Sequence, residues 1–159
     1  MIRNSLMLLW LGAAGFGLLA QGCASNGDSR VTSDLGGARG EVVSAALSQV
    51  GTRYTYGAES PGKALDCSAL TQHAYRAAGL NIPRMSTAQR AAAKPVRLSK
   101  VKPGDLVFFK IGRGQYHVGL MVGDDRFVHA STSKKQVRLS SLAAPYWRSR
   151  FIGAGTYLN

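Results

Sequence analysis

The stretch LDCSAL, residues 65–70, places a cysteine directly after an aspartate and at the start of an apolar pattern with helical spacing. Asp66 is a favoured N-cap residue, because its carboxylate can accept a hydrogen bond from a backbone N–H of the first turn. The pattern continues to about Ala78, and Gly79 is typical of the end of a helix. The sequence therefore predicts a helix that begins at Cys67, with the thiol in its first turn.

Further helices and a series of strands surround this segment. Residues 41–51 carry apolar side chains at helical spacing and end at a glycine, and a shorter helical pattern follows Ser86 and ends before Pro95. The later β-rich runs are DLVFFKI (105–111), HVGLMV (117–122), RFVHA (126–130), KQVRLS (135–140) and FIGAGTY (151–157). Helices followed by strands predict an α+β fold, with N-terminal helices packed on a five- to six-stranded antiparallel sheet.

The N-terminus has the layout of a secretory signal peptide. Arg3 precedes an apolar run over residues 6–20, which is shorter than the ~20 residues of a membrane span and leads to small residues. Leu19–Cys23 resembles a bacterial lipobox, in which the cysteine is lipidated and becomes the first residue of the mature protein. Ala20 stands where a lipobox usually has leucine, so ordinary signal-peptidase cleavage and plain secretion are the alternative.

The chain is expected to divide into a signal peptide over 1–22, a lipidated N-terminus with a flexible linker over 23–40, and one folded domain over 41–159. The linker is rich in Ser, Gly and Asp, which is typical of a tether. Cleavage of the signal peptide removes only Arg3 from a formal net charge of +12. This excess of Lys and Arg favours an anionic surface or polymer, and no nucleic-acid recognition motif accompanies it.

The thiol of Cys67 has the features of a nucleophile. Lipidation of Cys23 would leave Cys67 as the only thiol of an exported protein, where an unpaired cysteine calls for a functional reason. The N-terminus of a helix stabilises a thiolate through its dipole and its free N–H groups. The sequence therefore predicts a lowered pKa for Cys67.

A reactive thiol needs a base, and the chain has three histidines as candidates. His73 follows Cys67 by six residues, about 240° around an ideal helix, so it is expected to be a surface or rim residue. His117 opens one predicted strand, and His129 lies late in the next. These last two are therefore the candidates for a catalytic pair.

The register of the two strands decides whether these histidines meet. A two-residue loop within residues 123–125 would put His117 and His129 on opposite faces of the sheet, since facing residues must be directly opposite or two apart. A three-residue loop, or one bulge, would pair Gly119 with His129 and make His117 its diagonal neighbour. The sequence leaves both registers open.

If the two imidazoles converge beside the thiol, the three residues form a nucleophile, a base and an orienting group. Cys67 would attack, His117 would activate it, and His129 would fix the orientation and tautomer of His117. Cysteine and two histidines are also possible zinc ligands, but no CxxC or HExxH spacing accompanies them. No metal and no cofactor are expected.

Five blocks of the sequence resemble the NlpC/P60 family of cell-wall cysteine peptidases, more narrowly its short Spr-type murein endopeptidase lipoproteins. The blocks are GTRYTYG (51–57), LDCSAL (65–70), PRMSTAQ (83–89), KPGDLVFF (102–109) and HVGLMVGDDRFVHAS (117–131). The resemblance covers about residues 41–157 and implies a papain-like core with Cys67, His117 and His129 as the catalytic set.

The resemblance also gives a role to Tyr54, which matches a family tyrosine that contacts the substrate or the oxyanion; an aromatic loop anchor is the alternative. The backbone N–H of Cys67 is a natural second oxyanion donor. Arg53, Ala58 and Ala69 depart from the residues common in the family. These departures affect the fit of the substrate and leave the catalytic groups in place.

The function implied by the resemblance is hydrolysis of amide bonds in the stem or cross-link peptides of peptidoglycan, through an acyl-enzyme on the Cys thiol. Ala24 after Cys23 fits an outer-membrane lipoprotein that faces the periplasm, and a monomer is expected. The alternatives are an amidase or acyltransferase of the same fold and a non-catalytic wall-binding lipoprotein.

Overall fold

The computed structural model describes residues 35–159, so the predicted signal peptide, Cys23 and most of the predicted linker lie outside the described residues. The helices are α2 (Gly37–Leu47), α3 (Cys67–Ala77), α4 (Ser86–Ala92) and α5 (Pro145–Arg148), with a 3-10 turn at Leu98–Lys100. The strands are β1 (Arg53–Tyr54), β2 (Glu59–Ser60), β3 (Ala64–Leu65), β4 (Lys94–Val96), β5 (Leu106–Gly112), β6 (Gln115–Gly123), β7 (Arg126–Ser131), β8 (Gln136–Ser141) and β9 (Phe151–Thr156). No helix of this part of the chain is long and apolar enough to cross a membrane.

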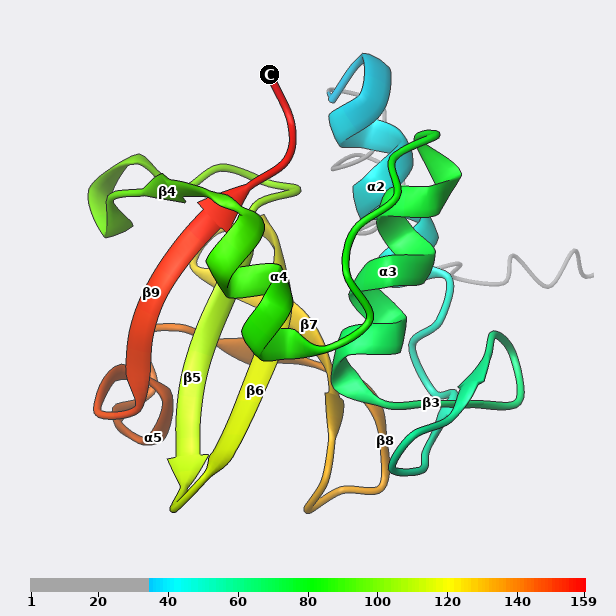
Figure 1. Ribbon diagram of the computed structural model, residues 1–159, viewed down its shortest axis with the longest axis vertical. Coiled ribbons are helices and arrows are strands. Elements are labelled where there is room, and N and C mark those ends of the chain that lie inside the picture. The colour runs from blue at the N-terminus through cyan, green and yellow to red at the C-terminus, as the bar shows by residue number, and fades with distance from the viewer. Residues whose placement is uncertain (1–34) are drawn as a thin grey trace, which may run out of the picture.

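The strands form one sheet in the order β2-β3-β1-β8-β7-β6-β5-β9-β4. The six strands from β8 to β4 pair antiparallel, and α2 and α3 lie side by side next to them (Figure 1). This confirms the predicted α+β class. The sheet is longer than predicted, because the two-residue strands β1, β2 and β3 extend one edge and β1 pairs with β3 in parallel. Two residues are too few to show an alternating pattern in a sequence.

Helix α3 begins at Cys67, as the cap signal predicts. The Asp66 side chain accepts a hydrogen bond from the backbone N–H of Ala69 over 2.8 Å. At the other end the helix stops at Ala77, and Gly79 follows with φ +73°, a conformation that favours glycine. The chain therefore holds the thiol at a helix start whose first turn is capped.

Helix α2 begins at Gly37 and ends at Leu47, four residues earlier at each end than the pattern over 41–51 predicts. A long-range contact accounts for the early start. Arg39 donates to the buried carboxylate of Asp105 over 2.9 Å and to the carbonyl of Pro103 over 2.8 Å. Tertiary packing therefore overrides the weak helix propensity of the glycines at this end.

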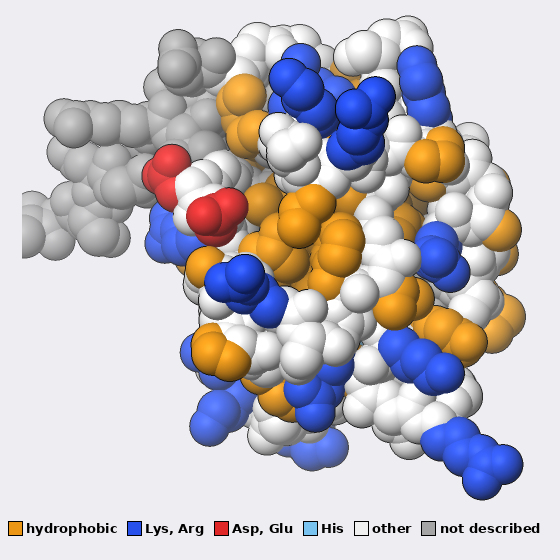
Figure 2. All heavy atoms as spheres, turned by 90° about the vertical axis from the view of Figure 1, so that its left-hand side faces the viewer, with side chains coloured by type: hydrophobic (Ala, Val, Ile, Leu, Met, Phe, Trp, Pro, Cys, Tyr) orange, Lys and Arg blue, Asp and Glu red, His pale blue; other side chains and the backbone are white. Residues whose placement is uncertain are grey.

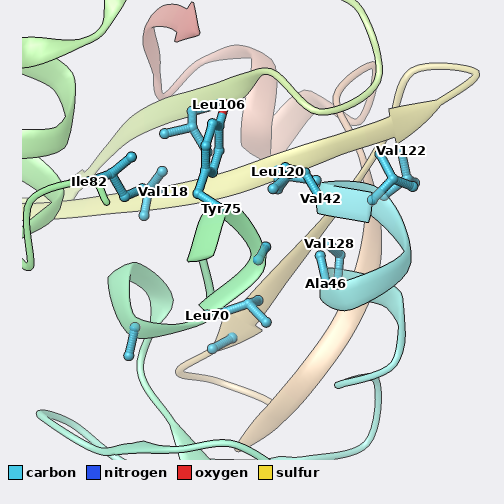
Figure 3. Close-up of a cluster of buried hydrophobic side chains, with 14 of the residues drawn as sticks. Val42, Ala46, Leu70, Tyr75, Ile82, Leu106, Val118, Leu120, Val122 and Val128 are labelled. Atoms are coloured by element: carbon cyan, nitrogen blue, oxygen red, sulfur yellow. The ribbon is translucent and has the colours of Figure 1, made fainter. Parts of the chain in front are cut away.

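The sheet has a hydrophobic core on each face. The larger core joins α2 and α3 to one face, where Leu70 and Tyr75 pack with strand residues that include Val118 and Leu120 (Figure 3). The smaller core lies on the other face and consists of Val107, Phe109, Met121, Phe127, Leu142 and Ala154, with Trp147 of α5 packed against it. Alternate residues of β5 and β6 therefore belong to different cores.

The turn between β6 and β7 combines a two-residue loop with a bulge. Asp124 and Asp125 have φ of +48° and +56°, which non-glycine residues adopt only in special turns. The strand register shifts between Met121 and Gly123. The extra residue of the bulge shifts the strand pairing by one position. His117 and His129 therefore avoid the opposite faces on which a plain two-residue loop would place them.

Beyond the bulge, Leu120 pairs with Val128. Continuing this register places Gly119 opposite His129 and makes His117 the diagonal neighbour of His129. The bulged alternative of the sequence analysis is thus confirmed. Both histidines lie on the face of the sheet that carries the smaller core.

Glycine is required at position 119 by this close approach of the strands. A Cβ there would clash with the ring of Phe127 and would lie 3.2 Å from the carbonyl oxygen of Val128. Phe127 in turn packs against His129, with ring centroids 5.2 Å apart. The absence of a side chain at Gly119 therefore leaves room for the Phe127 ring beside His129.

Candidate active site

Asp66 organises the segment around the thiol. Besides capping α3, its carboxylate accepts a hydrogen bond from the backbone N–H of Gly57 over 3.1 Å, which ties the preceding loop to the helix start. Only 7% of Asp66 is exposed. Cys67 is consequently presented from a helix end that is fixed on both sides.

Arg84 holds this carboxylate in place, and sequence reasoning gave it no role. Its guanidinium binds Asp66 through two nitrogens, at 2.6 and 3.0 Å. It also donates to the hydroxyl of Ser68 at 2.8 Å and pairs with Glu59 at 2.7 Å. Such a fork-shaped contact fixes both distance and orientation. Arg84 therefore links the loop before α4 to the residues on either side of Cys67.

Gln89 is a second organising residue that sequence reasoning missed. It is fully buried in α4, where its amide oxygen accepts from Thr71 at 2.8 Å and its amide nitrogen donates to the carbonyl of Ser68 at 3.0 Å. These bonds fasten α4 to the first turns of α3. The available signal was a glutamine in the segment 83–89, but a glutamine alone does not identify its partners.

His117 and His129 meet in the structure. Nε2 of His117 lies 2.9 Å from Nδ1 of His129, and Nε2 of His129 lies 2.9 Å from the hydroxyl of Ser140. Both imidazoles are 2% exposed. Nδ1 of His117 has no hydrogen-bond partner within residues 35–159. The chain of contacts thus leaves this one imidazole nitrogen of the pair free for another group.

An aromatic layer covers the histidine pair. The indole of Trp147 stacks on the His117 ring, with centroids 5.7 Å apart and planes inclined by 21°. It meets His129 edge-on at 4.9 Å. Phe109 and Phe127 pack against the same indole. Trp147, which sequence reasoning missed, therefore screens both imidazoles from water.

The thiol lies near the backbone of β6, at the residue that follows His117. The ladder of β6 and β7 ends at Leu120 and Val128, before the positions of the histidines. Beyond it, the backbone N–H of Val118 lies close enough to the Cys67 sulfur to favour its thiolate. Val118 directly follows His117 in the strand. Cys67 and His117 are thus both brought to the first half of β6.

Burial of the site corrects the prediction of a lowered pKa for the thiol. Burial raises the pKa of Cys67 to about 11, although the backbone N–H groups of Val118, Ser68 and Cys67 itself act in the opposite direction. Burial also lowers the pKa of His117 to about 4 and that of His129 to about 3. Desolvation therefore outweighs the helix terminus, and the resting site holds a neutral thiol beside neutral imidazoles.

Alkylation of the free protein tests this neutral state. We expect the rate of iodoacetamide labelling at Cys67 to keep rising with pH beyond the ordinary thiol range near ~8.5, because the folded-state pKa is about 11. Mass spectrometry of the Cys67 peptide across pH 5 to 11 provides the measurement. Rapid labelling at pH 6 that His117→Ala removes would instead indicate a thiolate–imidazolium pair.

Tyr54 lies near the thiol. It pairs with Leu65 across β1 and β3, which places it beside the segment that leads into Cys67. Burial raises the pKa of its phenol, and the charges of Cys67 and Asp66 act in the same direction. Tyr54 also packs against the larger core. Both the oxyanion role and the anchoring role given to this residue are compatible with its position.

His73 is half-buried in the middle of α3, and no contact joins it to the thiol among the described residues. Burial and then the charge of Arg76 lower its pKa. Within residues 35–159, no group of three or more His, Cys, Asp and Glu side chains is placed to hold a metal ion.

A cysteine at a helix start and a histidine with a polar partner on a sheet are residue types that thiol hydrolases combine, as in the Cys-His-Asn set of papain-like proteases. A model of the NlpC/P60 family matches residues 51–156. The chain therefore belongs to the NlpC/P60 family.

Relatives with recorded activities match over much of the chain. It is 41% identical over 110 residues to the murein DD-endopeptidase MepS/murein LD-carboxypeptidase of Escherichia coli K12, which covers 69% of this chain and 57% of the relative. It is 35% identical over 136 residues to the gamma-DL-glutamyl hydrolase of Bacillus subtilis, which covers 84% of this chain and 33% of the relative. The chain thus spans only part of the length of these relatives.

Solved structures agree with the fold. The peptidoglycan hydrolase RipB of Mycobacterium tuberculosis superposes with a TM-score of 0.66 at 27% identity, over 86% of this chain and 73% of RipB. The predicted NlpC/P60 fold is thereby confirmed.

Proposed function

We propose that this protein is a cell-wall cysteine peptidase that hydrolyses amide bonds in peptidoglycan stem or cross-link peptides. The observation that carries the proposal is the chain of contacts from His117 through His129 to Ser140. The Cys67 thiol lies near the backbone N–H of Val118, the residue that follows His117. The names of the murein endopeptidase relative and of RipB supply the substrate class.

The hydrogen bonds support one assignment of protons. If Nε2–H of His129 donates to Ser140, then Nδ1 of His129 accepts from Nε2–H of His117. Nδ1 of His117 then carries a lone pair and can act as a base. The low pKa of about 4 keeps His117 unprotonated at neutral pH, as a general base must be.

Catalysis proceeds through an acyl-enzyme. Nδ1 of His117 takes the thiol proton as Sγ of Cys67 attacks the scissile carbonyl, and the backbone N–H of Cys67 with the Tyr54 hydroxyl stabilises the oxyanion. The imidazolium then gives its proton to the leaving amine, and the C–N bond breaks to leave a thioester. His117 then removes a proton from water as the water oxygen attacks the thioester carbonyl. The C–S bond breaks to release the acyl half as a carboxylic acid, and the imidazolium returns its proton to the sulfur.

Digestion of purified sacculi tests the function. Wild-type protein should release soluble muropeptides whose new amine and carboxyl ends, read by mass spectrometry, identify the cleaved bond, and Cys67→Ala should release none. Products cut between sugar and peptide would indicate an amidase. Products in which the acyl group has been transferred to a new amine would indicate an acyltransferase. Binding to sacculi without release by the wild type would favour a non-catalytic wall-binding lipoprotein.

The location proposed for the enzyme is the periplasmic side of the outer membrane. Residues 1–22 act as the signal peptide, the lipidated Cys23 anchors the chain, and the linker that follows it tethers a monomeric catalytic domain whose first helix begins at Gly37. The Escherichia coli relative acts on murein by name, which fits a place in the envelope.

Cys23→Ala tests the anchor. The substitution should abolish incorporation of labelled palmitate and shift the protein out of the outer-membrane fraction, because the thiol is the only acceptor in the lipobox. Cys67→Ala is the matched control, since it removes the other cysteine and should leave labelling intact. Palmitate that persists in Cys23→Ala would refute the lipobox assignment.

A further inference from the structure

A small cavity lies between α4 and the strands β5, β6 and β9. Its volume is about 170 Å³, which suits one amino-acid side chain or a carboxylate with its neighbouring carbon. The residues of its wall that bear on the argument are Ser86, Thr87, Arg90, Tyr116, His117 and Ile152. Neither the proposed acyl-enzyme step nor the family match gives this cavity a role.

The guanidinium of Arg90 is the charged group of the wall. It donates to the carbonyl oxygen of Ile152 over 3.0 Å, which holds it against β9. No carboxylate pairs with it in the described part of the chain, where the ion pairs involve Arg39 and Arg84. Its remaining N–H donors are therefore available to an anion, beside the hydroxyls of Ser86 and Thr87.

The cavity can be assigned to one side of the scissile bond. The acyl half of the substrate becomes attached to Cys67, whereas the amine half receives its proton from His117. The cavity wall contains His117 and does not contain Cys67. It is therefore placed to receive the half of the substrate that leaves as an amine.

We propose that this cavity binds the leaving amine half and that Arg90 selects substrates in which the carbon next to that amine carries a free carboxylate. This inference rests on the proposed peptidase function and names the chemistry of one half of its substrate. A charge-assisted, two-pronged contact of guanidinium and carboxylate supplies the selection, with the hydroxyls of Ser86 and Thr87 as further donors.

The charge of the wider surface has the same sign as Arg90. Figure 2 shows the side of the molecule that carries β4 and β9, where Lys and Arg side chains surround a hydrophobic patch and acidic side chains are confined to one edge. A carboxylate that approaches this side meets a positive potential.

Two matched peptides test the proposal. Both contain the same scissile amide, and the carbon next to the leaving nitrogen carries a free carboxylate in one and a carboxamide in the other. The wild type should cleave the carboxylate peptide about 10- to 100-fold more efficiently by kcat/KM, the range expected for a hydrogen bond to a charged group. Arg90→Gln should bring the ratio close to one, and Arg90→Lys should keep part of it.

Arg76→Gln is the control, because Arg76 lies in the last turn of α3, at the end away from Cys67. It should leave the ratio unchanged. The ratio compares two substrates of the same sample, so a partly unfolded variant does not distort it. A wild type that cleaves both peptides equally, or an Arg90→Gln variant that keeps the preference, overturns this inference alone. A wild type that cleaves neither the peptides nor sacculi overturns the proposed function with it.

Discussion

Cys67→Ser is expected to lower the rate of muropeptide release by about 10⁴-fold or more. A serine hydroxyl fits the same space, but it is a far weaker acid than a thiol, and the site offers only a neutral imidazole with a pKa of about 4 as its base. The Asp66 cap and the Arg84 contacts do not involve the sulfur, so the fold should persist. Timed release from sacculi, with thermal unfolding measured in parallel, checks both statements.

The control for this experiment is the chain's other cysteine. Cys23→Ser, assayed on soluble peptides in detergent, should cleave at the wild-type rate, because position 23 lies outside the matched domain. Activity that survives in Cys67→Ser at more than a hundredth of the wild-type rate would require another nucleophile. If Cys67→Ser loses both its activity and its folded state, the loss of activity is no evidence for a catalytic thiol. The activity of a folded Cys67→Ala variant then decides the question.

The sequence predicted the helix start because its signal is local. A cap residue, the first turn and a terminal glycine lie within residues 66–79, and the structure has each of them in the expected place. The hairpin was harder. Two registers fitted residues 117–130, and the choice depended on a single bulge between Met121 and Gly123, which no alternation of polar and apolar residues reveals.

The remaining features of the site depend on contacts between distant segments. Arg84 meets Asp66 across 18 positions of sequence, and Ser140 meets His129 across 11. The burial that raises the pKa of Cys67 comes from packing of α3 against the sheet, which a local pattern does not measure. The helix terminus was visible in the sequence and its effect has the expected sign, but the larger and opposite effect of burial was not visible.

Substitutions of the histidine pair are expected to rank by what each removes. His117→Ala removes the base and should lower kcat by about 10²–10⁴-fold, the usual value of general-base assistance. His129→Ala leaves the base but removes the acceptor 2.9 Å from its Nε2, so the tautomer with a free Nδ1 is no longer favoured. The decrease in kcat caused by His129→Ala should be smaller than the decrease caused by His117→Ala.

His129→Asn and His129→Gln decide whether His129 acts by orienting His117. Their side-chain amide can still accept a hydrogen bond from Nε2–H of His117, so they should be more active than His129→Ala and less active than the wild type. The contact with Ser140 adds an independent check. Ser140→Ala should cause a smaller loss in the wild type than His129→Ala does, and almost none when added to His129→Ala, because both act through one chain. Wild-type kinetics in His129→Ala would remove His129 from the site and leave a dyad of Cys67 and His117.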